Sequence, residues 1–177
     1  MLRVALTGGI ACGKSVVSRV LHEKGCVVDS ADESAHALMA PGRPVWKKIV
    51  ARFGQAVLRP DGTIDRGRLG PIVFSDPEAR RFLNALVHPR VLAEKKRLMA
   101  RLEREGRTRI FVSEAALTVE AGYARFFDKV VVVHCCGGIQ RRRLMERDGI
   151  GDEEARRKIG AQMPPDEKLR HAVYVID

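Results

Sequence analysis

The chain has 177 residues, of which 45% are hydrophobic and 31% are charged, a composition typical of a globular protein with one core. No apolar run is long enough to span a bilayer, so we expect no membrane partner. The formal net charge of +10 predicts polyanionic ligands, but with aromatic residues at only 5% the chain lacks the stacking surface of a nucleic-acid-binding protein. A small substrate rich in phosphate is therefore favoured over nucleic acid.

The first pattern is an apolar run, residues 2–7, followed by a glycine-rich loop and an amphipathic helix. The loop is Gly8-Gly9-Ile10-Ala11-Cys12-Gly13-Lys14-Ser15, here called the phosphate loop, and it matches G-x-x-x-x-G-K-[ST] between a strand and a helix. Such a loop turns successive backbone N–H groups toward an anion, and the helix N-terminus adds its positive end. We expect nucleotide phosphates to bind at Gly9, Ile10, Ala11, Cys12, Gly13, Lys14 and Ser15, with Lys14 on the outer phosphates and the Ser15 hydroxyl on Mg²⁺.

The helix after the loop is expected over residues 14–24, ended by Gly25. A short buried strand, residues 26–28, follows and brings Asp29 and Asp32 to its carboxyl end. Ligands of open α/β sheets bind at that edge, so both carboxylates are predicted to lie near the phosphates.

The middle third of the chain has helical periodicity and no strand pattern. Helices are predicted over residues 33–39, 45–53, 65–74 and 77–87, with Ser75 or Asp76 as the N-cap of the last. His88-Pro89 is expected to end that helix before a long charged one that stops near Gly106. We expect a helical substrate-binding insertion at about residues 41–106, within a core of about 1–40 and 107–177.

The last third returns to apolar runs typical of buried parallel strands. Strands are predicted over residues 110–113, 129–134 and 172–176, and helices over residues 138–148, 152–163 and 165–170. Alternating strands and helices predict a doubly wound α/β fold in a single domain, residues 1–177. Because the chain starts directly in a strand, without a leader pattern, we expect a cytoplasmic location.

Asp32 is the best candidate for a general base. A phosphoryl transfer enzyme that acts on a hydroxyl uses a carboxylate to orient the hydroxyl and accept its proton. The alternative is that Asp32 caps a helix beginning at Glu33. The two roles do not exclude each other, and the position at the carboxyl end of a strand favours catalysis.

Arginine residues are concentrated after the fourth strand. Arg143 and Arg147 are four residues apart and share one helical face. Guanidinium groups aimed at a transferring phosphoryl group stabilise its charge, so we expect a lid at about residues 137–150 with Arg143 catalytic and Arg147 on ATP. The alternative, a solvated basic face, is expected for Arg141 or Arg142.

Three further residues have weaker signals. His88 precedes a proline and is predicted either to contact substrate or to be structural. Glu114 and Glu120 are candidates for holding water on Mg²⁺ or for ordinary surface positions, and Glu114 is favoured because it directly follows a strand.

A GTPase is excluded. The D-x-x-G match at residues 148–151 lies far downstream of the loop, and Asn84, the only asparagine, is not part of an N-K-x-D motif.

The chain as a whole resembles the dephospho-CoA kinase family. The resemblance rests on an ordered set of short motifs rather than on any one of them. The set is Leu6-Thr7-Gly8-Gly9-Ile10, Gly25 with Asp32, Pro41-Gly42, Phe53-Gly54, Asp61-Gly62, Asp65-Arg66, Val73-Phe74, His88-Pro89, Glu120-Ala121-Gly122, Gln140 with Arg143 and Arg147, and Ala161-Gln162-Met163-Pro164 with Lys168. Two departures are Ala11-Cys12, where the family more often has Gly-Ser, and Ser30 at the first position of the usual Asp-x-Asp.

The resemblance implies a three-layer P-loop kinase fold with a helical substrate domain and a lid. It implies transfer of the γ-phosphate of ATP, with Mg²⁺, to the ribose 3′-hydroxyl of dephospho-CoA, with Asp32 as base. His88 and Glu120 are expected to be further substrate residues. A monomer or weak homo-oligomer is expected. The alternatives are a P-loop kinase of another nucleoside or small hydroxyl compound, and a nucleotide-dependent nucleic-acid-binding protein.

Overall fold

The computed structural model describes residues 1–177, which form two compact units. The sheet unit comprises Met1–Ser30 and Met99–Asp177, and the helical unit comprises Ala31–Leu98. The helical unit thus begins earlier and ends earlier than the range 41–106 expected from the sequence. It begins earlier because helix α2 (Ala31–Leu38) packs against α3 (Pro44–Phe53) and adds apolar side chains to the core of that unit.

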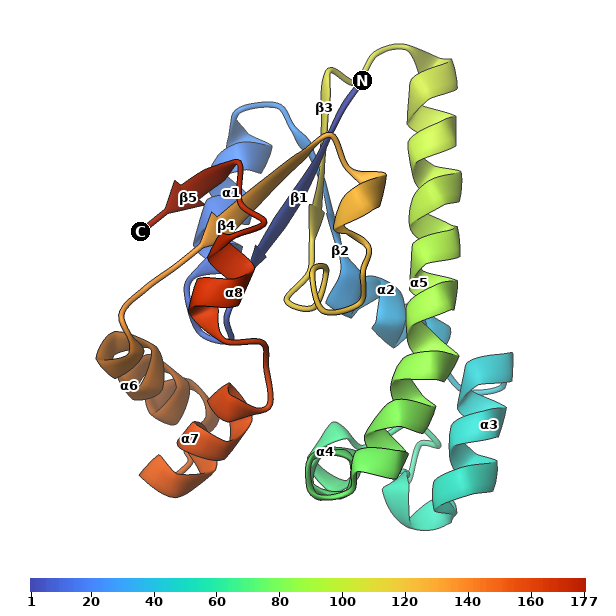
Figure 1. Cartoon of the computed structure of the whole chain (residues 1–177). Coiled ribbons are helices and arrows are strands. Elements are labelled where there is room, and N and C mark those ends of the chain that lie inside the picture. Colours follow the sequence, from blue (N-terminus) through green and yellow to red (C-terminus); the bar gives the residue numbers. More distant parts are fainter. The chain divides into compact units, whose positions relative to one another are not determined.

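The sheet unit is built on five parallel strands in the order β2-β3-β1-β4-β5 (Figure 1). Their bounds are β1 Leu2–Gly8, β2 Val27–Ser30, β3 Ile110–Glu114, β4 Lys129–Val133 and β5 Tyr174–Ile176. The α/β fold with a parallel sheet is confirmed. The strand β2 runs two residues beyond the predicted strand, so Asp29 lies inside it and not after it.

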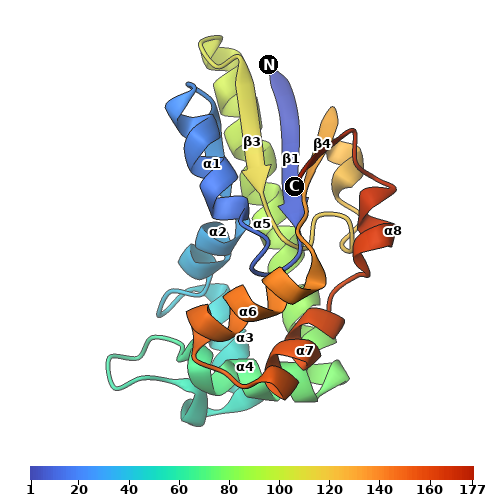
Figure 2. The same cartoon turned by 90° about the vertical axis from the view of Figure 1, so that its left-hand side faces the viewer.

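Alternate residues of β1 pack on opposite faces of the sheet, as the strand period of two requires. Val4 and Leu6 belong to a core shared with Val17 and Leu21 of helix α1 (Lys14–Glu23), which packs against β1, β2 and β3 (Figure 2). Ala5 faces the other side, where side chains near helix η2 (Ala124–Phe126) and helix α8 (Pro165–Leu169) cover it. With both faces covered, β1 is buried over its last five residues, up to the start of the phosphate loop.

Helices α6 (Gly137–Asp148) and α7 (Asp152–Gly160) pack against each other after β4. Ion pairs join them: Arg141 Nε lies 3.1 Å from Asp152 Oδ1, and Lys158 Nζ lies 3.1 Å from Asp148 Oδ2. The predicted lid, about residues 137–150, corresponds to α6 and the turn after it, and α7 packs against this segment.

The helical unit has its own hydrophobic core. Its remaining elements are η1 (Gln55–Val57), α4 (Arg66–Ser75) and most of α5 (Pro77–Glu105). Asp65 caps α4 by accepting the N–H groups of Gly67 and Arg68, and Asp76 accepts the N–H of Glu78 at the start of α5. Buried residues of this core include Val45, Ile49, Val57, Leu69, Val73, Leu86, Val87 and Val91.

The predicted helix break at His88-Pro89 is wrong, because α5 runs through both residues as one helix of 29 residues. Pro89 removes one helical N–H donor, at a cost of about 3 kcal/mol. Burial offsets this cost, because Leu86, Val87 and Val91, on both sides of the proline, are buried in one core.

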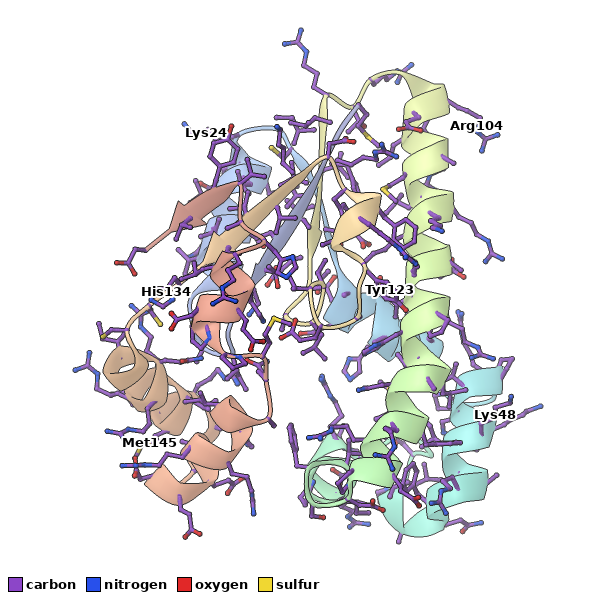
Figure 3. All side chains as sticks on the ribbon, in the orientation of Figure 1. Lys24, Lys48, Arg104, Tyr123, His134 and Met145 are labelled. Atoms are coloured by element: carbon purple, nitrogen blue, oxygen red, sulfur yellow. The ribbon has the colours of Figure 1, made fainter.

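Many of the basic side chains lie on exposed helix faces. Lys48 on α3 and Arg104 on α5 are two exposed examples (Figure 3). None of the helices combines the length and the apolar character needed to cross a membrane.

His88 is half-buried on α5, and this burial lowers the pKa of its imidazole below the ordinary value of about 6.5. Below about pH 6.5 the unfolded chain therefore binds a proton at this position more readily than the folded chain does. Wild type should therefore lose stability relative to His88→Gln as the pH falls. In urea titrations we expect the difference in free energy of unfolding, wild type minus His88→Gln, to be larger at about pH 7.5 than at about pH 5.5. The same pH dependence in His171→Gln, which alters an exposed histidine, would contradict this cause.

Candidate functional site

The phosphate loop joins the carboxyl end of β1 to the first residue of α1, as the motif predicts. Its backbone turns through the left-handed region at Ala11, with φ of 58°, and at Gly13, with φ of 97°. The Cys12 N–H donates to the Gly9 carbonyl oxygen at 3.3 Å, which closes the turn. This curl directs the N-terminus of α1 toward the space above the loop, where an anion is stabilised.

Gly8 is required by the backbone of the neighbouring strand. It pairs with Val133 of β4, and a Cβ atom on Gly8 would collide with the Val133 carbonyl oxygen. Its φ of 150° is also one that L-residues rarely adopt. The loop can therefore leave the sheet in this direction only with glycine at position 8.

The Lys14 ammonium lies over the loop. Its Nζ donates to the carbonyl oxygens of Gly8 at 3.1 Å and of Gly9 at 2.9 Å. The positive charge is thus held beside the loop, and its contact with the outer phosphates stays a prediction.

Two glutamines hold the loop at Ile10. The Ile10 N–H donates to Gln162 Oε1 at 2.7 Å, and Gln140 Nε2 donates to the Ile10 carbonyl oxygen at 2.9 Å. Gln140, on α6, is only 4% exposed. The sequence predicts no role for these side chains, although both belong to the motifs of the resemblance, because they lie 130 and 152 residues from Ile10.

Of the two arginines predicted to bind phosphate, Arg143 lies beside the loop. A Cβ built on Gly13 would lie 3.8 Å from Arg143 Nη1. Arg147 instead donates to Asp148 Oδ1 at 2.8 Å, and this hydrogen bond, aided by one from Lys158, lowers the pKa of Asp148. Both arginine side chains are exposed, so both are accessible to a ligand.

Glu114 ends β3 next to α1. It is in register with Leu6 of β1 on one side and with Ser30 of β2 on the other. The Ser18 hydroxyl donates to Glu114 Oε2 at 2.5 Å. Ser15 precedes Ser18 by about one helical turn, so the Ser15 hydroxyl and the Glu114 carboxylate lie on the same side of α1. Both groups offer oxygen atoms, which are the ligands that Mg²⁺ prefers.

Asp32 and His88 belong to the helical unit, while the phosphate loop belongs to the sheet unit. Asp32 is exposed in the first turn of α2, which begins at Ala31 and not at Glu33. Its predicted capping role for a helix starting at Glu33 therefore does not apply. Asp32 follows the end of β2 by two residues, and its catalytic role stays a prediction.

Glu120 forms a buried ion pair with Lys168 of α8, at 2.7 Å between Oε1 and Nζ. The Lys168 side chain is 3% exposed and that of Glu120 is 18% exposed. Lys168 also donates to the Ala116 carbonyl oxygen at 2.8 Å, which accepts a second bond from the Thr7 hydroxyl at 3.2 Å. This network fixes the segment after β3 against β1, and a direct contact of Glu120 with substrate stays a prediction.

We expect Lys168→Met to lower the free energy of unfolding by about 3–5 kcal/mol, since it leaves Glu120 charged and buried without its partner. The double variant Glu120→Gln/Lys168→Met should recover a large part of this loss, because it removes both charges. Urea unfolding measures both variants. A double variant as unstable as the single one would show that Glu120 and Lys168 are not coupled.

Comparisons with known proteins agree on one family. The family model of dephospho-CoA kinase matches residues 2–177. A dephospho-CoA kinase of Symbiobacterium thermophilum is 48% identical over 174 residues, covering 98% of this chain and 72% of the relative. The chain belongs to the dephospho-CoA kinase family. The resemblance found in the sequence is thereby confirmed.

Comparison with solved structures gives the same result. A dephospho-CoA kinase from Campylobacter jejuni superimposes with a TM-score of 0.68 at 32% identity, covering 98% of this chain and 86% of that one. The crystal structure of TT1252 from Thermus thermophilus has a TM-score of 0.80 at 32% identity, with the same coverage. The protein is therefore a kinase with a P-loop α/β fold.

Proposed function

We propose that this protein transfers the γ-phosphoryl group of ATP to the ribose 3′-hydroxyl of dephospho-CoA, giving coenzyme A and ADP. Membership of the dephospho-CoA kinase family supports the substrate. The observation that carries the chemistry is the phosphate loop, which has the Lys14 ammonium above it and the Arg143 guanidinium beside it. Two phosphate-rich substrates also account for a net charge of +10.

The phosphate loop binds ATP through its backbone N–H groups and the N-terminus of α1. Lys14 moves from the carbonyl oxygens of Gly8 and Gly9 to the β- and γ-phosphates. Ser15 would hold Mg²⁺ together with phosphate oxygens, and Glu114 would hold its water. Bound there, Mg²⁺ neutralises negative charge on the phosphate oxygens.

Asp32 orients the 3′-hydroxyl and accepts its proton as the bond to phosphorus forms. Its position supports this role, since β2 ends at the sheet edge from which the phosphate loop also starts. Ser30 and Leu6 are aligned through Glu114 and lie two strands apart, a separation of about 10 Å across the sheet. The carboxylate also lies in the first turn of a helix, where the helix dipole stabilises its charged form.

Residues of α6 stabilise the transferring group. Arg143 neutralises charge that spreads over the γ-phosphoryl oxygens, and Arg147 leaves Asp148 to bind ATP when the lid closes. His88 and Glu120 are proposed to position dephospho-CoA. We further propose that the protein acts in the cytoplasm, without nucleic acid, as a monomer or weak homo-oligomer.

We expect Arg143→Ala to lower kcat roughly 10-fold to 10²-fold, because the charge next to Gly13 is lost from the transition state. Arg142→Ala is the matched control, since Arg142 is an exposed neighbour on the same helix. Steady-state kinetics with ATP and dephospho-CoA measures both. Equal losses in the two variants would indicate a general effect of basic charge.

The proposed function is tested by ADP release from ATP and Mg²⁺ with one acceptor at a time: dephospho-CoA, adenosine, AMP, pantetheine or none. Turnover with dephospho-CoA alone supports the proposal. Turnover with another acceptor would show that the protein is a kinase but that dephospho-CoA is not its substrate. The alternative of a nucleic-acid-binding protein would be favoured by tight binding of random DNA or RNA at physiological salt, with an affinity that falls steeply as the salt concentration rises.

A further inference from the structure

Two thiols meet at the phosphate loop. Cys135 donates a hydrogen bond to the Cys12 sulfur at 3.4 Å, although the residues are 123 positions apart. They meet because β1 and β4 are neighbouring strands: Gly8 pairs with Val133, so the phosphate loop and the segment after β4 leave the sheet side by side. The Cys12–Cys135 pair is therefore fixed by the sheet itself.

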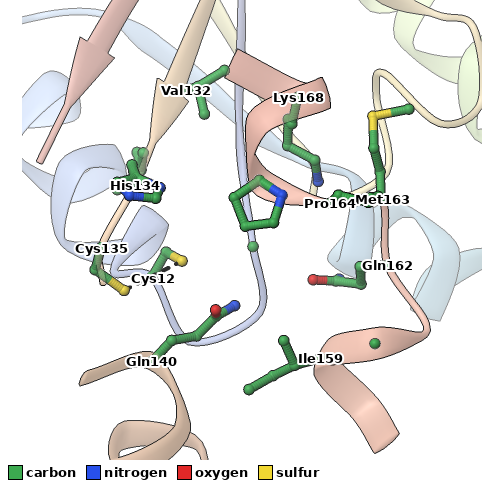
Figure 4. Close-up of a pocket in the computed structure, with 14 residues that line it drawn as sticks. Cys12, Val132, His134, Cys135, Gln140, Ile159, Gln162, Met163, Pro164 and Lys168 are labelled. Atoms are coloured by element: carbon green, nitrogen blue, oxygen red, sulfur yellow. Dashed lines mark hydrogen bonds between the residues drawn. The ribbon is translucent and has the colours of Figure 1, made fainter. Parts of the chain in front are cut away.

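The pair is shielded from bulk solvent and still open to a small molecule. Cys12 is 6% exposed and Cys135 is 9% exposed. Both line a cavity of about 180 Å³ bounded also by Gln140, Gln162 and Lys168 (Figure 4). Burial raises the pKa of the Cys135 thiol to about 11, and the hydrogen bond to Cys12 adds to this effect. Cys135 is thus held as a protonated donor and Cys12 is the acceptor.

The other two cysteines are placed differently. Cys26 is buried just before β2, at the amino end of the strands, whereas Cys12 follows the carboxyl end of β1. Cys136 is exposed. They serve as internal controls for any chemistry at the Cys12–Cys135 pair.

We propose that Cys12 and Cys135 form a reversible oxidation site, at which a peroxide converts the two thiols to a disulfide and weakens nucleotide binding. The Cys12 sulfur attacks the peroxide O–O bond, which gives a sulfenic acid and one water from hydrogen peroxide. The Cys135 sulfur then attacks the Cys12 sulfur while the Cys135 thiol proton passes to the leaving hydroxyl, so the S–S bond forms, the S–O bond breaks and a second water leaves. Two electrons pass from the thiols to the peroxide, and both thiol protons end in water. A thiol reductant reverses the reaction.

Disulfide formation is coupled to the loop because Cys12 lies at its turn. The sulfur atoms must close from 3.4 Å to about 2.05 Å. The loop cannot move as a whole, since Gln140 and Gln162 hold Ile10. The backbone of residues 11–13 therefore has to move, and Ala11 and Gly13 are already in the left-handed region there. This movement turns the N–H groups of residues 11–13 away from the phosphates.

The inference rests on the proposed binding of ATP by this loop, so the test begins with the affinity of the fully reduced protein for ATP with Mg²⁺. The protein is then treated with stoichiometric hydrogen peroxide, with and without ATP. Intact mass and peptide mapping identify the cross-link independently of any activity. ATP affinity is measured before oxidation, after it, and after reduction with dithiothreitol.

We expect a Cys12–Cys135 cross-link that forms more slowly with ATP bound. We expect ATP affinity to fall roughly tenfold or more, because N–H contacts weaken steeply when misaligned, and to return on reduction. Cys136→Ser and Cys26→Ala should form the same cross-link, while neither Cys135→Ala nor Cys135→Ser should form it. No cross-link, a cross-link through another cysteine, or unchanged ATP affinity in the oxidised protein would overturn the proposal. If the reduced protein does not bind ATP, the proposed function fails, and the coupling proposed here is overturned with it.

Discussion

Asp32→Asn is expected to lower kcat by roughly 10²–10⁴-fold while the affinity for ATP stays nearly unchanged. Asparagine keeps the size of the side chain and loses the carboxylate that accepts the 3′-hydroxyl proton. The affinity for ATP is retained because the contacts with its phosphates are made by the phosphate loop. Steady-state turnover and equilibrium ATP binding, measured on the same preparation, separate the two effects.

Glu33→Gln is the matched control for Asp32→Asn. Both acidic residues are exposed in the first turn of α2, so both variants lose the same favourable interaction with the helix dipole. Only Asp32→Asn should lose turnover. Equal turnover in wild type and Asp32→Asn would show that Asp32 only stabilises the N-terminus of α2. Another group would then have to accept the proton.

Lys14→Ala is expected to lower kcat/KM roughly 10³-fold, because the charge that neutralises the transferring group is lost. Lys14→Arg should restore little of this. The planar guanidinium does not replace a point charge that fits between the carbonyl oxygens of Gly8 and Gly9. Kinetics with ATP and dephospho-CoA measures both variants.

The control for Lys14→Ala is Lys24→Ala, which removes an exposed lysine just after the other end of α1 (Figure 3). It should retain wild-type kcat/KM. Urea unfolding of Lys14→Ala checks that the loss is not caused by unfolding of the loop region. Wild-type kcat/KM in Lys14→Ala would show that Lys14 of the phosphate loop takes no part in phosphoryl transfer.

Local patterns predicted the elements that position the site. The motif at residues 8–15 was enough to predict the strand, loop and helix around Lys14, because its eight residues are consecutive and its pattern can be read locally. The requirement for glycine at position 8, in contrast, comes from Val133 of β4 and appears only in the folded sheet. The continuous apolar runs predicted β3 and β4 as buried strands. The α/β fold follows from these elements and is confirmed.

The contacts that hold the loop could not be predicted in this way. Gln140 and Gln162 reach Ile10 only once β4, α6 and the segment after α7 are in place. The Glu120–Lys168 pair and the Cys12–Cys135 pair likewise depend on sheet order, which no local period encodes. The helix break at Pro89 was mispredicted for the same reason, since burial of Leu86 and Val91 in one core outweighs a local rule.

The most direct test of the central claim is transfer of labelled phosphate. The protein is incubated with Mg²⁺ and ATP labelled in the γ-phosphate, together with dephospho-CoA or its 3′-deoxy analogue, and the products are separated and their label counted. We expect label on dephospho-CoA, in a product identical to coenzyme A, and none on the 3′-deoxy analogue. Label on the analogue, or label that appears only as inorganic phosphate, would contradict the account.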